Sequence, residues 1–117
     1  MSLHADIVAW GPYSPDVADH LEYPREFYQS TKPGALVVTE LFGIFEGSGA
    51  SQRFASLLGI SDVWDFTQHK IDPERIDAAG LRLLFQELDE AETYIKQVDS
   101  LIALRSHGFQ FIFRPNG

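Results

Sequence analysis

The sequence contains no cysteine. Disulfide bonds, thiolate chemistry and cysteine-ligated metal sites are therefore excluded, and we expect a reducing, cytoplasmic location. No apolar run approaches the roughly 20 residues of a membrane-spanning helix, and the N-terminus lacks the basic and apolar regions of a signal peptide. We therefore expect neither a membrane protein nor a secreted one.

Basic residues are also few, because nine Lys and Arg stand against 17 Asp and Glu and give a net charge of -8. A surface this negative repels phosphate backbones and anionic lipids, so we expect no binding to nucleic acid or to a membrane surface. A basic partner protein is favoured instead. The alternative interpretation is that the charge serves solubility alone.

The 117 residues include 44% hydrophobic and 13% aromatic residues, among them nine Phe. A chain of this length buries roughly two thirds of the surface that it exposes when unfolded, so it can form a core without disulfides or metals. Repeats, linkers and low-complexity tracts are absent. We therefore expect a single domain over residues 1–117.

The central stretch runs from Ala35 to Ser51 and predicts a strand that passes into a helix from Ser48. Its apolar residues follow one another instead of alternating, which indicates a central strand covered on both faces, or one that bends at Gly43. Gly59 and Ile60 then have the pattern of a helix C-cap.

Two shorter patterns precede that strand. Residues 5–10 predict a first strand, and Ser14-Pro15-Asp16 predicts a short helix with the Ser14 hydroxyl as N-cap. Pro24 begins another turn through Tyr28. The triplet at residues 32–34, Lys-Pro-Gly, fits a type II turn.

A helical period extends from Ala78 to His107, after an N-cap pattern at Asp72 and Pro73. One straight helix of this length would measure about 45 Å, whereas a domain of this size is only about 35 Å across. We therefore expect a bend or break, and the capping-box pattern at residues 89–92 supplies one. Gly108 ends the helix, and residues 109–114 predict a last strand.

These elements predict an α+β fold. We expect a small, mainly antiparallel or mixed sheet of about three strands, with the first and last strands adjacent. The long helical segment, bent or broken, lies across one face of this sheet.

One candidate site is the strand-to-helix turn, with the residues Gly47, Ser48, Gly49, Ser51 and Arg53. Exposed backbone N–H groups at a helix start can hold an anion of the phosphate type, and Arg53 can assist. The turn matches neither a Walker loop nor a dinucleotide fingerprint. The alternative interpretation is an ordinary turn in which Ser48 serves as N-cap.

A second candidate is a group of aromatic residues that crowds the first quarter of the chain and also includes Phe27. We take Trp10, Tyr13, Tyr23, Arg25 and Tyr28 from it as partner-binding candidates, because Tyr, Trp and Arg are enriched at binding hot spots. The alternative is that these rings pack as core or lid material.

No catalytic set emerges, because the Gly-x-Ser-x-Gly elbow of a nucleophilic serine is absent. Asp65 and His69 lie four apart and would meet on a helix as a base and its orienter, or as two metal ligands. A surface or half-buried imidazole is the alternative for His69. We expect no metal and no cofactor.

Our first hypothesis is a non-enzymatic protein-binding or inhibitory module that recognises a basic partner. The alternative is a small-molecule or anion-binding protein, or a small enzyme, that uses the Gly47–Arg53 turn. A third hypothesis is a homodimer formed through the C-terminal strand, if residues 109–114 lie at a sheet edge.

Overall fold

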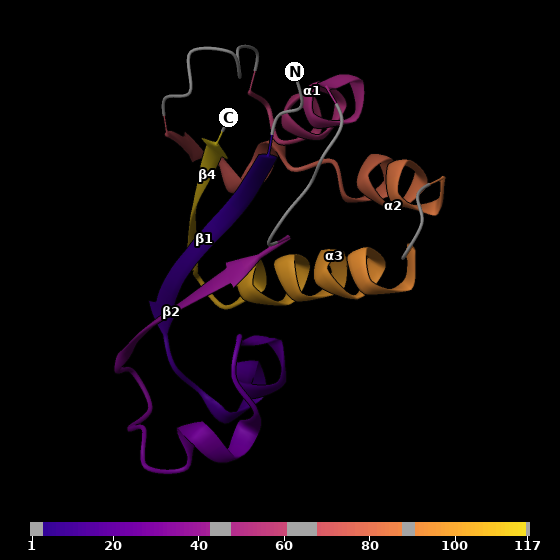
Figure 1. Ribbon diagram of the computed structural model, residues 1–117. Helices are drawn as coiled ribbons and strands as arrows, with labels where there is room; N and C mark the ends of the chain where they lie inside the picture. Colours follow the sequence, from indigo (N-terminus) through magenta and orange to yellow (C-terminus); the bar gives the residue numbers. More distant parts are fainter. Residues whose placement is uncertain (1–3, 43–47, 61–67, 88–90, 117) are drawn as a thin grey trace.

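The described residues form a four-stranded antiparallel sheet with helices on one face (Figure 1). The computed structural model describes residues 4–42, 48–60, 68–87 and 91–116, the side chains of residues 4, 48–51 and 116 excepted. The elements are β1 (His4–Pro12), η1 (Pro15–His20), η2 (Arg25–Tyr28), β2 (Leu36–Leu41), α1 (Ser48–Leu57), β3 (His69–Ile71), η3 (Pro73–Arg75), α2 (Ala78–Gln86), α3 (Ala91–Ser106) and β4 (Gln110–Asn116).

The α+β class is confirmed, but the sheet among the described residues has four strands and not three. The additional strand is β3, which spans only three residues and pairs with β4. A strand this short contains no alternation that a sequence pattern could detect.

The strand order is β2-β1-β4-β3, so the first and last strands are adjacent, as predicted. This order corrects two expectations. The strand from Ala35 forms β2 at an edge and not in the centre. The C-terminal strand β4 lies inside the sheet between β1 and β3, so the edge position that the homodimer hypothesis required is not met.

The edge strand β2 is buried on one face only. Thr39 and Leu41 point into the core, whereas Leu36 and Val38 are 71% and 56% exposed. The consecutive apolar residues suggested that both faces of this strand are covered. They lie instead on one buried face and one exposed face. Predicted bending at Gly43 lies outside the described residues.

Phe42 follows β2 and adopts a left-handed backbone conformation with φ of 63°. This conformation costs a residue other than glycine about 1 kcal/mol. The ring packs in the core with centroids 5.1 Å from Phe54 and 5.4 Å from Phe85. The backbone N–H of Phe42 also donates to Oε1 of Gln97. These contacts hold the strand end against α1, α2 and α3.

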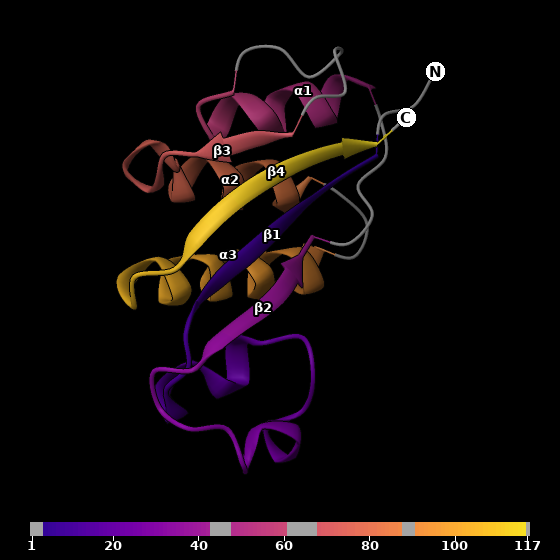
Figure 2. The same cartoon turned by 90° about the vertical axis from the view of Figure 1, so that its left-hand side faces the viewer.

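The helices α1, α2 and α3 cover one face of the sheet, as Figure 2 shows. The core between the two layers is rich in phenylalanine, and its fully buried side chains include Ile7, Phe54, Leu81, Phe85, Phe111 and Phe113. Phe109, Phe111 and Phe113 share the inner face. No described helix covers the opposite face.

We call that opposite side of the sheet the open face. Strand alternation and the pairing register assign its residues, because directly paired residues point to the same side. They include Asp6, Val8, Trp10, Leu36, Val38, Glu40, Lys70, Gln110, Ile112 and Arg114.

The predicted helix ends are largely present. Gly59, with φ of 80°, ends α1 with bonds from Ile60 N to Ala55 O and from Gly59 N to Ser56 O, and Gly108 ends α3 similarly. The predicted break of the long helical segment falls between α2 and α3, although residues 88–90 lie outside the described residues.

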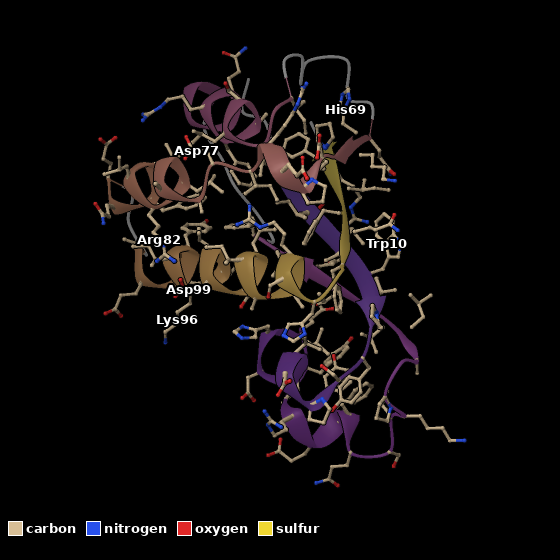
Figure 3. The ribbon with its side chains drawn as sticks, turned by 180° about the vertical axis from the view of Figure 1, so that it is seen from behind. Trp10, His69, Asp77, Arg82, Lys96 and Asp99 are labelled. Carbon is tan, nitrogen blue, oxygen red and sulfur yellow. The ribbon has the colours of Figure 1, made fainter. Side chains whose placement is uncertain are left out.

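The start of α2 differs from the prediction. Asp72 caps only the one-turn η3, where its side chain accepts from Glu74 N at 3.0 Å. The helix α2 begins after a second cap, Asp77, which accepts from Gly80 N at 2.9 Å. Figure 3 shows Asp77 at this position. An acidic residue near a helix N-terminus also suits the helix dipole.

Candidate functional site

Residues 13–35 form a lobe that connects β1 to β2 and projects beyond the end of the sheet (Figures 1 and 2). Two backbone hydrogen bonds close its neck: Tyr13 N donates to Ala35 O, and Gly34 N donates to Tyr13 O, both at 2.8 Å. The predicted type II turn is present there, because Ala35 N donates to Lys32 O and Gly34 has φ of 88°. The lobe therefore has a fixed base.

The lobe also rests on α3. The 3-10 helix η1 packs against α3, and its Val17 and Ala18 are buried. Nδ1 of His20 lies 3.0 Å from Oγ of Ser100 on α3. Apolar packing and this hydrogen bond hold the lobe against the helical layer.

The two turns of the lobe begin where the sequence predicts, with one difference. Ser14 precedes η1, but its side chain makes no capping bond, and Val17 N donates to the Ser14 backbone carbonyl at 3.1 Å. Pro24 precedes η2, and Phe27 N donates to its carbonyl at 2.9 Å.

Four aromatic rings form a series from the interior of the lobe to its surface. Tyr13 stacks on Tyr28 with centroids 5.8 Å apart, and both rings are buried. Tyr28 meets Phe27 edge-on at 5.2 Å, and Phe27 contacts Tyr23 at 4.7 Å. Phe27 and Tyr23 are 67% and 51% exposed. The buried rings thus support an exposed aromatic pair.

Tyr28 is the centre of this series. Its hydroxyl accepts a hydrogen bond from Tyr23 N at 3.4 Å, and its ring contacts both Tyr13 and Phe27. Burial raises the pKa of Tyr28 above its ordinary value. Tyr28 therefore positions the exposed pair and does not itself face solvent.

Acidic side chains surround the exposed pair in the sequence. Asp16, Asp19, Glu22 and Glu26 are all exposed. Arg25 pairs with Asp19, because Nε donates to Oδ1 at 3.0 Å and Nη2 donates to Oδ2 at 2.8 Å. This pairing lowers the pKa of Asp19 and raises that of Arg25.

The structure brings together four of the five partner-binding candidates. Tyr13, Tyr23, Arg25 and Tyr28 lie in the lobe, although Tyr13 and Tyr28 pack inside it, as the alternative interpretation for these rings expected. Trp10 lies elsewhere, opposite Val38 on the open face. Figure 3 shows its side chain on the side of the sheet away from the helices.

Phe27 belongs to the surface although we did not select it as a binding candidate. Its signal in the sequence is its position four residues after Tyr23 and directly before Tyr28. Within the short turn η2, neighbouring rings point in different directions, so one is buried and the other is exposed.

The strand-to-helix turn is described only in part. Gly47 lies outside the described residues, and Ser48, Gly49 and Ser51 form the start of α1 without described side chains. Arg53 is exposed, and its Nη1 lies 3.6 Å from Oε2 of Glu87. The guanidinium thus has a carboxylate nearby, and the anion site stays a prediction.

In the part of the chain that the structure describes, no three His, Asp or Glu side chains lie together so that they could hold a metal ion. His69 begins β3, and Asp65 lies outside the described residues. A shallow depression of about 350 Å³ beside β3 is lined by Lys70, Ile71, Asp72 and Pro73. Over the same ranges, no helix has the length and apolar character to cross a membrane.

No protein-family model, curated protein or solved structure matches this chain.

Proposed function

We propose that this protein is a binding module that recognises a basic segment of another protein through its lobe. The contact surface consists of Glu22, Tyr23, Glu26 and Phe27, and we call these four residues the lobe surface. The observation that supports the proposal most directly is the contacting pair of Tyr23 and Phe27, which is more than half exposed on a lobe held at its neck and by α3.

An exposed aromatic pair can contribute binding energy when a partner covers it. Each aromatic side chain offers about 150–250 Å² of surface, and burial of apolar surface contributes about 25 cal/mol per Å². Two thirds of Phe27 and half of Tyr23 are available for this purpose. Aromatic residues of this kind dominate the affinity at many protein interfaces.

The charges favour a basic partner. Glu22 and Glu26 are exposed beside the aromatic pair, and Asp16 adds a third carboxylate on the same lobe. Arg25 forms its ion pair with Asp19, at 2.8 Å, and its charge also acts on Glu26 more weakly. With a net charge of -8 on the whole chain, long-range attraction accelerates the encounter with a basic protein.

Rigidity also supports the proposal. The neck bonds at Tyr13 and the His20 contact with Ser100 hold the lobe in place before binding. A preorganised surface loses less conformational entropy when it associates. The absence of cysteine is consistent with a reducing compartment, and we propose the cytoplasm as the location.

A fluorescence-anisotropy panel tests the proposal. The probes are labelled peptides of about 15 residues in which Lys or Arg alternates with Leu or Phe, and matched peptides in which Glu replaces every basic residue. We expect saturable binding of the basic peptides, weaker binding at about 300 mM than at about 50 mM salt, and none of the acidic peptides.

Variants assign the binding to the lobe surface. Phe27→Ala should weaken binding of the basic peptides about 30-fold, as loss of a hot-spot residue does. The control is Leu83→Ala, which removes a side chain of similar exposure, 64%, from α2. Equal affinities for the two variants, or no saturable binding by any basic peptide, would contradict the proposal.

A further inference from the structure

The open face of the sheet carries a charge pattern that is complementary to itself. Register places Glu40, Val8, Ile112 and Lys70 in one row across all four strands, because Val8 pairs with both Glu40 and Ile112, and Ile112 pairs with Lys70. The row therefore has an acid at one end, a base at the other and two apolar residues between them.

A neighbouring row on the two central strands also places an acid on the side of β2 and a base on the side of β3. Asp6 on β1 pairs with Arg114 on β4, and the guanidinium donates to its carboxylate at 2.8 and 2.5 Å. Arg114 also donates to Glu40 at 3.0 Å. These four charged residues, Asp6, Glu40, Lys70 and Arg114, sum to zero on a chain of net charge -8.

We propose that a second copy of this chain docks on the open face, with the two sheets stacked around a two-fold axis parallel to the strands and midway between β1 and β4. That axis places β1 over β4 of the partner copy and β2 over β3. Glu40 then faces Lys70, Asp6 faces Arg114, and Val8 faces Ile112. Each of these contacts occurs twice, as in any isologous interface.

The third row fits the same axis. Trp10 pairs with Gln110 across β1 and β4, so the stacked copies place the indole of each chain opposite the Gln110 amide of the other. The indole N–H is a donor that seeks an acceptor when it is buried. Val38, 56% exposed beside Trp10, adds apolar surface.

The charge pattern disfavours a second simple stacking. A two-fold axis that runs perpendicular to the strands and along the row of Glu40 and Lys70 places each strand over its own copy, so Glu40 faces Glu40 and Lys70 faces Lys70. Like charges placed directly opposite one another are unfavourable. Because the four charged residues of the open face sum to zero, this face also disfavours a basic or an acidic protein as its partner. In this respect the open face differs from the lobe surface, which favours a basic partner.

Strand lengths and spacing set the expected strength. The four strands present a plane on the order of 400 Å² per copy, which is smaller than the about 800 Å² that each partner buries in a standard interface. A dimer of this size should dissociate in the micromolar range. Sedimentation velocity between about 5 and about 500 µM should show a concentration-dependent monomer and dimer.

Charge exchange is the sharpest test. In Glu40→Lys two Lys side chains meet at each end of the row, and in Lys70→Glu two Glu side chains meet there. Each single variant should raise the dimer Kd at least about 30-fold, because symmetry repeats the clash. An equimolar mixture of the two variants restores opposite charges at both ends, so it should form heterodimers with nearly the wild-type Kd. The double variant E40K/K70E should likewise form homodimers.

Controls separate this effect from general charge and from folding. Glu92→Lys and Lys96→Glu make the same charge changes on exposed positions of α3 and should leave the dimer Kd unchanged. Circular dichroism checks that every variant is folded. A wild-type chain that stays monomeric at about 500 µM would overturn the proposal, as would single variants that dimerise normally or a mixture that stays monomeric.

Discussion

Replacing Phe27 and Tyr28 by alanine, one at a time, should separate a ring kept for binding from a ring kept for folding. Phe27 is 67% exposed and Tyr28 is 5% exposed. Each ring offers about 200 Å², and burial contributes about 25 cal/mol per Å². The buried part of Phe27 should therefore contribute about 1.5 kcal/mol to the free energy of unfolding, and the buried part of Tyr28 about 4.5 kcal/mol. The second value agrees with the about 3–5 kcal/mol that large-to-small changes at buried aromatic positions cost.

Urea denaturation followed by circular dichroism measures both values. At a slope of about 1–3 kcal/mol per molar urea, Phe27→Ala should lower the midpoint by about 0.5–1.5 M, and Tyr28→Ala should lower it about three times as far. The area values are upper limits, because the unfolded chain already buries part of this surface. If Phe27→Ala cost more than about 3 kcal/mol, Phe27 would be a structural ring and the reasoning from its exposure would be wrong.

Gly11→Ala should destabilise the protein by about 1–3 kcal/mol in thermal unfolding, because the added Cβ would lie 2.6 Å from ring carbons of Phe109. Burial raises the pKa of Tyr28 in the folded state. The stabilisation that the protonated hydroxyl contributes is therefore complete below pH about 10 and is lost as the pH rises through the higher folded pKa. Above pH about 10, the free energy of unfolding of Tyr28→Phe should depend less on pH than that of the wild type. A thermal-shift screen with phosphate and sulfate tests the Gly47–Arg53 turn, where a ligand at 100 times its Kd would stabilise by about 2.7 kcal/mol and no shift would remove the anion site.

Much of the fold follows from local sequence signals. Helix ends were predictable because Gly59 and Gly108 adopt positive φ that other residues avoid, and a Gly after an apolar helical period marks such an end. The need for a break in the long helical segment followed from size, since an unbroken helix would have been longer than the domain, and the capping-box pattern at residues 89–92 gave its place. These signals lie within a few residues or in the chain length, and tertiary contacts do not alter them.

The position of each strand in the sheet could not be predicted in the same way. A run such as the one from Ala35 reads as buried on both faces, yet Leu36 and Val38 face outward because β2 is at the edge. Strand order depends on long-range pairing that no local pattern records. The three-residue β3 was missed for a related reason, since its pairing with β4 alone defines it.

The candidate site was predictable in composition but not in exposure. The aromatic residues of the first quarter do gather in the lobe, but the sequence could not show that Tyr28 turns inward while Phe27 turns outward. Trp10 was separated from the group because strand alternation places it on the open face. Aromatic residues suit cores and interfaces equally, so only their surroundings distinguish the two roles.

The most direct test of the proposed function is an NMR titration of the ¹⁵N-labelled chain with one of the basic amphipathic peptides. Binding at the lobe surface predicts saturable shifts of the amide signals of Glu22, Tyr23, Glu26 and Phe27, and in Phe27→Ala the shifts of the other three residues should require about 30-fold more peptide. Saturable shifts confined to the open face or to α1, or no shifts at all, would contradict the assignment of this lobe as the binding site.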